Sequence, residues 1–478
     1  MADVICPIAQ WAEKDPEHPA IWESHKPTTY RELNQLVSVA ESALRKRGIG
    51  YGDRIAVRLP VSIELIAIFS ALNRIGAIAL LLSQRERPAV QDEQIESLTC
   101  RAVVHNSIHD GPEEPVRYFH SSTLFRSAEA GTKSIGTLSP DSPAAAVFTS
   151  GSVGKPKAAL LSYGNLYYNA LGSNENIPLG PDDRWLVGLP LYHVGGLGIL
   201  FRAFIGGGSV VLPEPGFDLA RQIAMHQITH ISVVNKQLYD VVNLDGESSG
   251  SRTLKAVLVG GSAVSTKLIG RALNAGFPIH TSYGLTEMAS QVTTTSVQDR
   301  VVGVHSSGKV LRYRQIRIVD GEILVRGECQ FQGYLTGTGV ERAIGTNDWF
   351  HTRDLGTIDD QGYLTVQGRK DNMFISGGEN IQPEEIERIL LNMPRVQDAM
   401  VVPVDDEEYG DRPVAFIQSP PGTDLDEEAI KQSLRESLPG FKIPTRIFPY
   451  LSPEHVTSLK FSRKELRALA KDLLRNRR

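Results

Sequence analysis

The chain has 478 residues, of which 41% are apolar and 22% are charged, and its formal net charge is −5. Such values are typical of a globular protein with two or three domains, and they argue against nucleic acid or an anionic membrane surface as a partner. The three cysteines, Cys6, Cys100 and Cys329, have no metal-binding spacing, and their odd number does not suggest a disulfide framework. We therefore expect a protein of the reducing cytoplasm.

The sequence predicts no integral membrane segment. Its longest apolar stretch, 63–82, is interrupted by Glu64, Asn73 and Arg74, so it predicts a buried helix followed by a strand rather than a membrane span. The first residues also lack the order of basic, apolar and small residues that marks a signal peptide.

Between Ala144 and Ser282, short β-type runs alternate with helical patterns. We expect strands at 185–189, 209–212, 230–234, 255–259 and 279–282, and helices at 218–226, 235–242 and 265–275. This alternation predicts a mostly parallel sheet with helices on both faces. Ligands of such sheets bind to the loops at the carboxyl ends of the strands, so the loops after residues 148, 189, 259 and 282 are the candidate binding loops.

The pattern changes after Val304 to β-type runs punctuated by glycine, which predicts a β-rich subdomain at about 304–369. A charged, turn-prone link follows at 368–372, and then a smaller unit with a Gly-Gly hairpin and a helix that starts near Pro383 with acidic residues in its first turns. The predicted fold class is α/β. We expect a large N-terminal region of doubly wound sheets (1–369), a hinge (370–372) and a small, mobile α+β C-terminal domain (373–478).

The segment 148–157, Phe-Thr-Ser-Gly-Ser-Val-Gly-Lys-Pro-Lys, predicts a phosphate-binding loop. Glycines let backbone N–H groups converge on an anion, hydroxyls add donors, and lysines supply the counter-charge. The glycine spacing and the proline after Lys155 exclude the common NTPase loop. A flexible linker is the usual alternative for such a stretch. It is disfavoured because an apolar run leads in and a helical pattern starting at Ser162 leads out.

Several other segments offer groups for nucleotide binding, each with an alternative. The ring of Tyr283 can stack on a purine, Thr286 can donate to a phosphate, and Glu287 can hold Mg²⁺, whereas the motif alone is more often a surface turn. Together with the predicted phosphate loop at 149–157, the functional interpretation of this motif is favoured. Asp354 can accept two ribose hydroxyls, although a lone aspartate there is more often a turn residue.

Three further segments are less decisive. Gly260-Gly261-Ser262 permits close approach to a flat ligand, and a tight turn is equally compatible with it. His193 lies among apolar residues and glycines, where a buried structural histidine and a functional one are about evenly balanced. From its spacing alone, Lys460 belongs to a solvated basic tail.

Taken together, these segments resemble the adenylate-forming superfamily of acyl- and aryl-CoA ligases, luciferases and peptide-synthetase adenylation domains, from about residue 20 to the end of the chain. The resemblance is carried, in chain order, by 149–157, 283–287, 352–354, 368–371, 377–385 and Lys460. Within this superfamily, the segments 189–196, 284–290, 352–354 and 459–463, with Arg202, are similar to the o-succinylbenzoate:CoA ligases of menaquinone and phylloquinone biosynthesis.

The resemblance implies two half-reactions at one site: ATP converts an acid to an acyl-adenylate, and CoA then attacks it after the C-terminal domain has rotated. It implies that ATP is bound by Thr149, Ser150, Gly151, Ser152, Gly154, Lys155, Lys157, Gly260, Gly261, Ser262, Tyr283, Gly284, Asp354 and Arg369. It implies that Glu287 holds Mg²⁺, that Thr286 contacts the α-phosphate, and that Lys460 bridges that phosphate and the substrate carboxylate.

The resemblance also implies an acid pocket lined by His193, Gly195, Gly196, Arg202 and Leu285, with His193 at its boundary with the pantetheine pocket. Asp371 would be the pivot of the rotation, and Gly377, Gly378 and Glu379 would then line the CoA tunnel. Arg202 has an argument of its own, because it is the sole basic residue between Arg184 and Arg221. The carboxylate of o-succinylbenzoate that is not activated must lose its water, which is costly without a cation. A structural ion pair is the alternative for Arg202.

The chain departs from the superfamily pattern at four places. Val153 replaces a threonine of the phosphate loop, Ala158 replaces a glycine, Arg353 replaces the commoner glycine before Asp354, and Lys460 lacks the usual preceding glycine. We find no physical reason for valine at position 153. The leading hypothesis is an ATP-dependent ligase that makes o-succinylbenzoyl-CoA from an aryl dicarboxylate.

Three alternatives stay open. They are a ligase for another aryl or acyl acid, a nucleotide-binding protein without turnover and, least favoured because no carrier domain follows, a peptide-synthetase module. A homodimer or higher homo-oligomer is compatible with the sequence.

Overall fold

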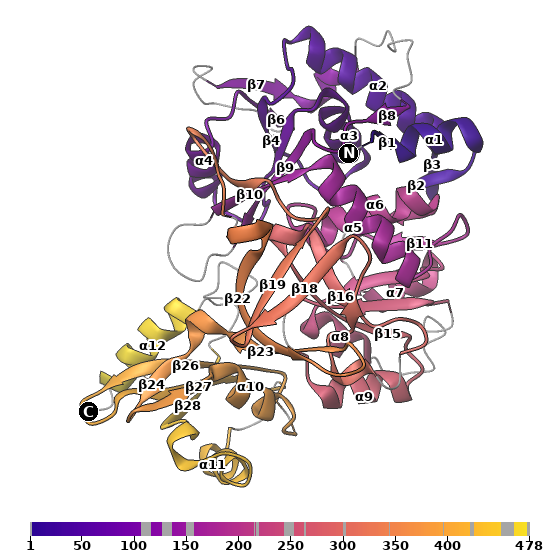
Figure 1. Cartoon of the computed structure of the whole chain (residues 1–478). Coiled ribbons are helices and arrows are strands. Elements are labelled where there is room, and N and C mark those ends of the chain that lie inside the picture. Colours follow the sequence, from indigo (N-terminus) through magenta and orange to yellow (C-terminus); the bar gives the residue numbers. More distant parts are fainter. Residues whose placement is uncertain are drawn as a thin grey trace.

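A computed structural model describes thirteen stretches of the chain. They are residues 2–106, 116–126, 136–149, 157–214, 216, 219–242, 253–261, 264–299, 303–343, 345–394, 396–420, 425–450 and 463–475. Figure 1 shows a large body that runs in colour from indigo to orange, and a smaller C-terminal part, orange to yellow, below β22 and β23. In the described part, no helix combines the length and the apolar character that crossing a membrane requires.

Two large sheets build the body. The first has eight strands, in the spatial order β21 (Gly339–Glu341), β20 (Gly333–Thr336), β10 (Lys157–Ser162), β9 (Pro143–Thr149), β5 (Ile78–Leu81), β4 (Arg54–Arg58), β6 (Ala102–His105) and β7 (Arg117–His120). The second has nine, in the order β17 (Lys309–Val310), β16 (Ser290–Thr294), β15 (Ile279–Leu285), β14 (Ala256–Val259), β13 (His230–Val233), β11 (Arg184–Leu186), β12 (Ser209–Val211), β2 (Pro19–Glu23) and β3 (Lys26–Thr29). A short pair, β1 (Val4–Ile5) and β8 (Thr137–Leu138), stands apart.

Helices cover both sheets, as the alternating pattern predicts. They are α1 (Pro7–Lys14), α2 (Tyr30–Lys46), α3 (Ile63–Ile75), α4 (Pro88–Ser97), α5 (Tyr163–Asn176), α6 (Val194–Gly206), α7 (Leu219–Met225), α8 (Asn235–Val242) and α9 (Thr266–Asn274). Helix α5 contacts β9 and β10 of the first sheet and β16 of the second, so it lies between the two sheets. The apolar residues of α3, α5 and α6 join those of both sheets in one continuous core.

The expectation of a mostly parallel sheet between Ala144 and Ser282 is confirmed for β11 to β15, but it does not extend to β9 and β10. Strands β9 and β10 form an antiparallel hairpin in the eight-stranded sheet, whereas β11 to β15 are parallel strands of the other sheet. Strand β10 reads Lys-Ala-Ala-Leu-Leu-Ser and contains no β-branched residue. Its sequence therefore has little β-propensity, and it owes its conformation to its two neighbours β9 and β20.

The β-rich subdomain is confirmed as a four-stranded antiparallel sheet: β18 (Arg314–Val319), β19 (Glu322–Gly327), β22 (Phe350–Ile358) and β23 (Leu364–Arg369). A single 3-10 turn, η6 (Lys370–Asn372), occupies the predicted hinge. Beyond it lie β24 (Phe374–Ser376), β25 (Glu379–Ile381), β26 (Asp398–Asp406), β27 (Gly410–Gln418) and β28 (Arg446–Pro449), with α10 (Pro383–Leu391), α11 (Glu427–Arg435) and α12 (Arg463–Arg475). These elements have apolar cores of their own, and the Gly-Gly hairpin and the helix at Pro383 are confirmed.

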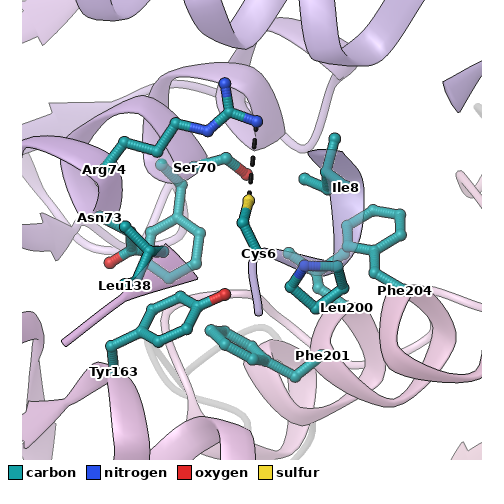
Figure 2. Close-up of a pocket in the computed structure, with 12 residues that line it drawn as sticks. Cys6, Ile8, Ser70, Asn73, Arg74, Leu138, Tyr163, Leu200, Phe201 and Phe204 are labelled. Carbon is teal, nitrogen blue, oxygen red and sulfur yellow. Dashed lines mark hydrogen bonds between the residues drawn. The ribbon is translucent and has the colours of Figure 1, made fainter. Parts of the chain in front are cut away.

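A small cavity of about 40 Å³ lies among α1, α3, α5 and α6. Figure 2 shows its lining, in which the guanidinium of Arg74 donates to the sulfur of Cys6 at 3.6 Å, with Tyr163 and Phe201 on another side. Arg74 also donates to Asn34 and Ser38, so its charge is spread over neutral polar partners. None of the predicted site residues that the structure describes lines this cavity.

Candidate active site

A bulge in β22 places Thr352 and Asp354. Leu324 of β19 pairs with His351 and Glu322 pairs with Leu355, so three residues of β22, 352–354, stand opposite the single residue Ile323. The hydroxyl of Thr352 donates to the Ile323 carbonyl at 2.6 Å, and the amide of Asp354 donates to that hydroxyl at 3.0 Å. Bulges of this kind re-aim side chains next to active sites, and this one fixes the position of Asp354.

Asp354 joins Tyr283 and Arg369 in one hydrogen-bonded group. The Tyr283 hydroxyl donates to Oδ2 of Asp354 at 2.6 Å, and Nη1 of Arg369 donates to Oδ1 at 3.2 Å. Burial raises the pKa of Asp354, while these two donors act in the opposite direction. The carboxylate has unused lone pairs beside an aromatic ring, so it can accept further hydrogen bonds from the hydroxyls of a ligand such as a ribose.

Glu287 lies close to this group and belongs to a second one. It is in the short helix η3 (Thr286–Met288) directly after β15, and its Oε1 accepts a 2.7 Å hydrogen bond from the hydroxyl of Tyr334 on β20. Its charge contributes to raising the pKa of Asp354. Burial, and then Glu287, raise the pKa of Tyr334. The ammonium of Lys157, at the end of the predicted phosphate loop, lies 4.9 Å from the centre of the Tyr334 ring.

Tyr334 therefore connects the loop end to Glu287, and sequence analysis missed it. Its surroundings, Gly-Tyr-Leu-Thr, carry no motif, and only the pairing of β20 with β10 brings it to the site. Thr149 closes the other end of the loop by donating to the Lys157 carbonyl at 3.3 Å. The predicted residues Ser150, Gly151, Ser152, Gly154, Lys155, Ser262 and Lys460 lie outside the described residues, as does Val153.

The residues present fit a magnesium ion that shares its ligands with phosphates. In the described part of the chain, no three His, Cys, Asp or Glu side chains form a metal cluster. Mg²⁺ in nucleotide sites needs only one or two protein carboxylates, since phosphates and water supply the rest. Glu287, with one oxygen held by Tyr334, offers such a carboxylate.

Four predicted glycines differ in their surroundings. A Cβ at Gly284 would lie 2.1 Å from the Ser290 carbonyl oxygen, so this glycine permits the irregular pairing of β15 with β16. Gly260 faces the Ser282 hydroxyl, and Gly261 has a φ of +85°, so both belong to a tight turn after β14. Gly196, predicted to line the acid pocket, is needed for backbone packing. A Cβ there would lie 2.1 Å from the Pro190 carbonyl oxygen, so Gly196 packs α6 against the preceding turn.

His193 and the neighbouring residues lie at the start of α6. His193 is the N-cap residue of this helix, and its exposed ring lies 4.6 Å from that of Tyr192. The exposure removes the alternative of a buried core histidine. Gly195 has the Leu189 side chain beside it, and Leu285 at the end of β15 is half-buried against the main core.

Arg202 is a buried cation, and no carboxylate in the described part pairs with it. It lies on α6 with 1% of its surface exposed, its guanidinium 5.2 Å from the Trp185 ring. Nη2 donates to the Ser290 hydroxyl at 3.4 Å, whereas Nε and Nη1 have no acceptor among the described residues. Burial, and then the charge of Arg314, lower its pKa to about 9. The alternative of a structural ion pair is therefore not supported, and a buried guanidinium of this kind can hold an anionic ligand.

The predicted hinge is held by ion pairs, whereas the C-terminal hairpin is exposed. The guanidinium of Arg353 donates from Nε to both carboxylate oxygens of Asp371, at 2.7 and 2.8 Å, and Arg369 lies 3.7 Å from the same carboxylate. Gly377 and Gly378 have φ values of +58° and +87°, which a two-residue hairpin turn requires. These two glycines and Glu379 are exposed.

Two family profiles match the sequence. The profile described as "AMP-binding enzyme" matches residues 8–335, and the profile described as "AMP-binding enzyme C-terminal domain" matches residues 385–452. The chain belongs to the AMP-binding enzyme family.

Curated relatives and solved structures show which members of the family the chain is similar to. This AMP-binding enzyme is 34% identical to the 2-succinylbenzoate–CoA ligase of Bacillus cytotoxicus, over 97% of this chain and 98% of the relative. Its fold is similar to that of the o-succinylbenzoate CoA synthetase (MenE) of Bacillus subtilis in complex with the acyl-adenylate intermediate OSB-AMP, with a TM-score of 0.85, 28% identity, and coverage of 98% and 99% of the two chains. The same synthetase in complex with ATP and magnesium ion also has a TM-score of 0.85 at 28% identity, with coverage of 98% and 100%.

Proposed function

We propose that this enzyme is an AMP-forming acid–CoA ligase that converts 2-succinylbenzoate to its acyl-adenylate and then to 2-succinylbenzoyl-CoA for quinone biosynthesis. The observation that carries the proposal is the convergence of Tyr283, Asp354 and Arg369 next to Glu287. These groups come from different elements, and together they match the ring, ribose and phosphate–metal parts of ATP. The named relatives and the ligands of the B. subtilis structures support the acid.

In the first half-reaction, a carboxylate oxygen of the substrate forms a bond to the α-phosphorus, and the bond from that phosphorus to pyrophosphate breaks. Lys157 and the loop before it are proposed to hold the departing phosphates, and Thr286 to contact the α-phosphate. A magnesium ion on Glu287 would neutralise phosphate charge when bound. The step needs no covalent bond to the protein.

Lys460 is proposed to bridge the substrate carboxylate and the α-phosphate during this step. Two unit charges about 4 Å apart interact by roughly 4 kcal/mol at an effective dielectric of about 20. Since about 1.4 kcal/mol changes a rate tenfold, this contact accounts for on the order of a thousandfold in rate. The magnitude is large enough to make Lys460 a catalytic residue of the first step.

In the second half-reaction, the CoA thiol attacks the acyl carbonyl, and AMP leaves with the electron pair of the broken carbon–oxygen bond. Residues 370–372 are proposed as the hinge between the domains 1–369 and 373–478, with Asp371 as the pivot. After rotation, Gly377, Gly378 and Glu379 would line the path of pantetheine, and His193 would stand between this path and the acid pocket. Both the hairpin and His193 are exposed, so each can be reached by a ligand.

Arg202 is proposed to bind the carboxylate that is not activated. The substrate is an aryl dicarboxylate, and the charged group that enters the pocket has to exchange water for protein donors. Nε and Nη1 of Arg202, which have no acceptor among the described residues, are such donors. The half-buried residues Gly195 and Leu285 would form another part of the pocket wall. A location in the cytoplasm is part of the proposal, and the three buried, unpaired cysteines support it.

The test is to incubate the protein with ATP, Mg²⁺, CoA and 2-succinylbenzoate and to detect the thioester by mass spectrometry. We expect 2-succinylbenzoyl-CoA and AMP in equal amounts. A panel of other aryl and acyl acids, assayed for pyrophosphate release, separates this substrate from its competitors. Binding of ATP without any pyrophosphate release from the panel would instead identify a nucleotide-binding protein without turnover.

A further inference from the structure

Arg353 occupies a backbone conformation that disfavours its own side chain. Its φ is +62°, in the left-handed region, at the middle of the bulge that residues 352–354 form opposite Ile323. Bulges of this geometry favour glycine at this position, because a Cβ in the left-handed region is strained. A strained residue persists where the surrounding structure holds it, and such residues cluster at functional sites. We therefore expect the arginine side chain to make contacts that offset this strain.

The contacts of the Arg353 side chain are with the predicted hinge. Nε of Arg353 contacts both carboxylate oxygens of Asp371, the central residue of η6, and Nη2 lies 2.5 Å from Oδ1. The Arg353 side chain is 58% exposed, whereas that of Asp371 is only 12% exposed. A second pair, between Lys370 and Glu322 at 3.3 Å, also ties the hinge to the sheet of β19 and β22. The planar fork of arginine matches a carboxylate better than lysine does.

We propose that Arg353 is a positioning residue that clamps the hinge at Asp371 and holds the C-terminal domain in the orientation that serves adenylation. The inference rests on the proposed function, because it assigns the clamp to one of the two half-reactions. The side chain of Arg353 contacts the hinge carboxylate of Asp371, and its proposed role involves no contact with a substrate.

The described orientation favours adenylation over thioester formation. The Gly377–Gly378 hairpin, which is proposed to line the CoA path, is exposed, and Gly377 packs on Tyr409 of its own domain. By contrast, α12 starts at Arg463, whose guanidinium donates to Glu384 at 3.1 Å. Glu384 in turn contacts Asn372 of the hinge. The charge of Glu384 also acts on Asp354, and the side-chain amide of Gln382 donates to the Arg369 carbonyl at 3.0 Å. The start of α10, against which the start of α12 packs, is thus turned toward the nucleotide residues, whereas the hairpin is not.

The C-terminal domain is also held at a second place, away from the hinge. Oδ1 of Asn392, at the end of α10, accepts from the Thr266 hydroxyl at 2.9 Å and from the Ser265 hydroxyl at 3.1 Å, at the start of α9. The amide nitrogen of Asn235 donates to the Gln397 carbonyl at 3.1 Å. Because these contacts remain when Arg353 is changed, we expect loss of the clamp to weaken this orientation rather than abolish it.

The kinetic test compares Arg353→Gly, Arg353→Lys and the control Asp320→Gly. Asp320 also has a positive φ, of 50°, in the turn after β18, so its change to glycine relieves the same kind of strain without touching the hinge. Single-turnover assays follow acyl-adenylate formation from ATP and 2-succinylbenzoate, and thioester formation from supplied acyl-adenylate and CoA.

For Arg353→Gly, we expect adenylation to slow about 10-fold, which corresponds to about 1.4 kcal/mol, with thioester formation within about 2-fold of the parent. Its melting temperature should be unchanged or higher, because glycine suits the bulge. Arg353→Lys should fall between parent and glycine variant. Parent-like adenylation in Arg353→Gly, or equal losses in both half-reactions, would overturn the inference.

A second measurement does not depend on the substrate. Spin labels at the exposed positions Asn274→Cys on α9 and Ser433→Cys on α11 report the distance between the two domains, and the three native cysteines are buried and do not compete. Arg353→Gly should broaden the distance distribution, whereas Asp320→Gly should leave it unchanged. An unchanged distribution in Arg353→Gly contradicts the clamp even if the parent proves inactive on 2-succinylbenzoate, and inactivity alone contradicts only the proposed function.

Discussion

The hydroxyl of Tyr334 donates a 2.7 Å hydrogen bond to Oε1 of Glu287, and the same tyrosine ring lies 4.9 Å from the ammonium of Lys157. One residue thus links the end of the predicted phosphate loop with the carboxylate proposed to bind magnesium. The bond holds one carboxylate oxygen and leaves the other for a metal ion. Groups that orient a metal ligand in this way contribute measurably to metal affinity.

Replacement of Tyr334 by phenylalanine should weaken magnesium binding. Partners that hold a metal ligand contribute roughly 10- to 100-fold to metal affinity, so we expect the Mg²⁺ concentration for half-maximal pyrophosphate release to rise about 10-fold, with the rate recovered at saturating Mg²⁺. Tyr363→Phe is the matched control, because it removes a similar 2.6 Å hydrogen bond to Asp299 outside the site. An unchanged Mg²⁺ requirement in Tyr334→Phe would separate this tyrosine from the metal.

Replacement of Lys460 by alanine should affect the two half-reactions unequally. The ammonium is proposed to neutralise charge between acid and nucleotide only in the first step. We therefore expect acyl-adenylate formation to slow at least ~100-fold, while thioester formation from supplied acyl-adenylate suffers much less. Lys464→Ala, which changes an exposed lysine four positions later in the sequence, is the control. Equal losses in both steps would contradict the role of Lys460.

The local features of the fold could be predicted from the sequence. Strands β11 to β15 and helices α7 to α9 begin and end within a few residues of the expected bounds, because their apolar runs and helical periodicities are local properties. The turn at Gly377-Gly378 was predictable for the same reason, since the two glycines supply the positive φ values that the hairpin needs.

The features that depend on distant pairing could not be predicted. Strand β10 and Tyr334 are in the site because β10 pairs with β20, about 175 residues later in the chain. The left-handed conformation of Arg353 follows from the bulge opposite Ile323, which no local pattern signals at an arginine. The motifs predicted Tyr283, Asp354 and Glu287, which the structure brings near one another, whereas Tyr334, which contacts Glu287, had no signal of its own.

Acid should destabilise the protein partly through His230. This side chain is fully buried against Trp185, and burial lowers its pKa to about 4, from about 6.5 in an unfolded chain. As the pH falls, the unfolded chain binds a proton on this histidine before the folded protein does, and this shifts the equilibrium toward unfolding. Its contribution is thus complete above pH ~6.5 and is lost as the pH falls from ~6.5 toward ~4, by about 3 kcal/mol in all.

The measurement is urea unfolding of the parent and of His230→Gln at a series of pH values. The difference in the free energy of unfolding between the two proteins should shrink by about 3 kcal/mol between pH ~7.5 and pH ~4. His120→Gln changes an exposed histidine and controls for the substitution itself. A difference that stays constant with pH would show that His230 does not titrate on unfolding in this range.

Replacement of Arg202 by alanine should raise the KM for 2-succinylbenzoate far more than the KM for ATP. Removal of one partner of a buried charge pair costs about 2–5 kcal/mol, so the increase should be about 30-fold or more. Arg202→Lys keeps the charge but loses the planar fork, and we expect it to recover only part of the affinity. An unchanged KM for the acid would remove Arg202 from the pocket.

Gly198 should control the acid site through Arg202, one helical turn later on α6. A Cβ at position 198 would lie 2.9 Å from Nη2 and 3.2 Å from Cζ of Arg202, so alanine would force the guanidinium to move. Glycine inside a helix is less favourable than alanine by about 1 kcal/mol, so Gly198→Ala should not lower the intrinsic stability of α6. We therefore expect a raised KM for 2-succinylbenzoate, an unchanged KM for ATP and a melting temperature near that of the parent. Gly270→Ala, at a glycine of α9 with open space around it, is the matched control for a glycine change inside a helix. A parent-like KM for the acid in Gly198→Ala would mean that Arg202 can bind the carboxylate from a shifted position, and that the room beside Gly198 does not set its geometry.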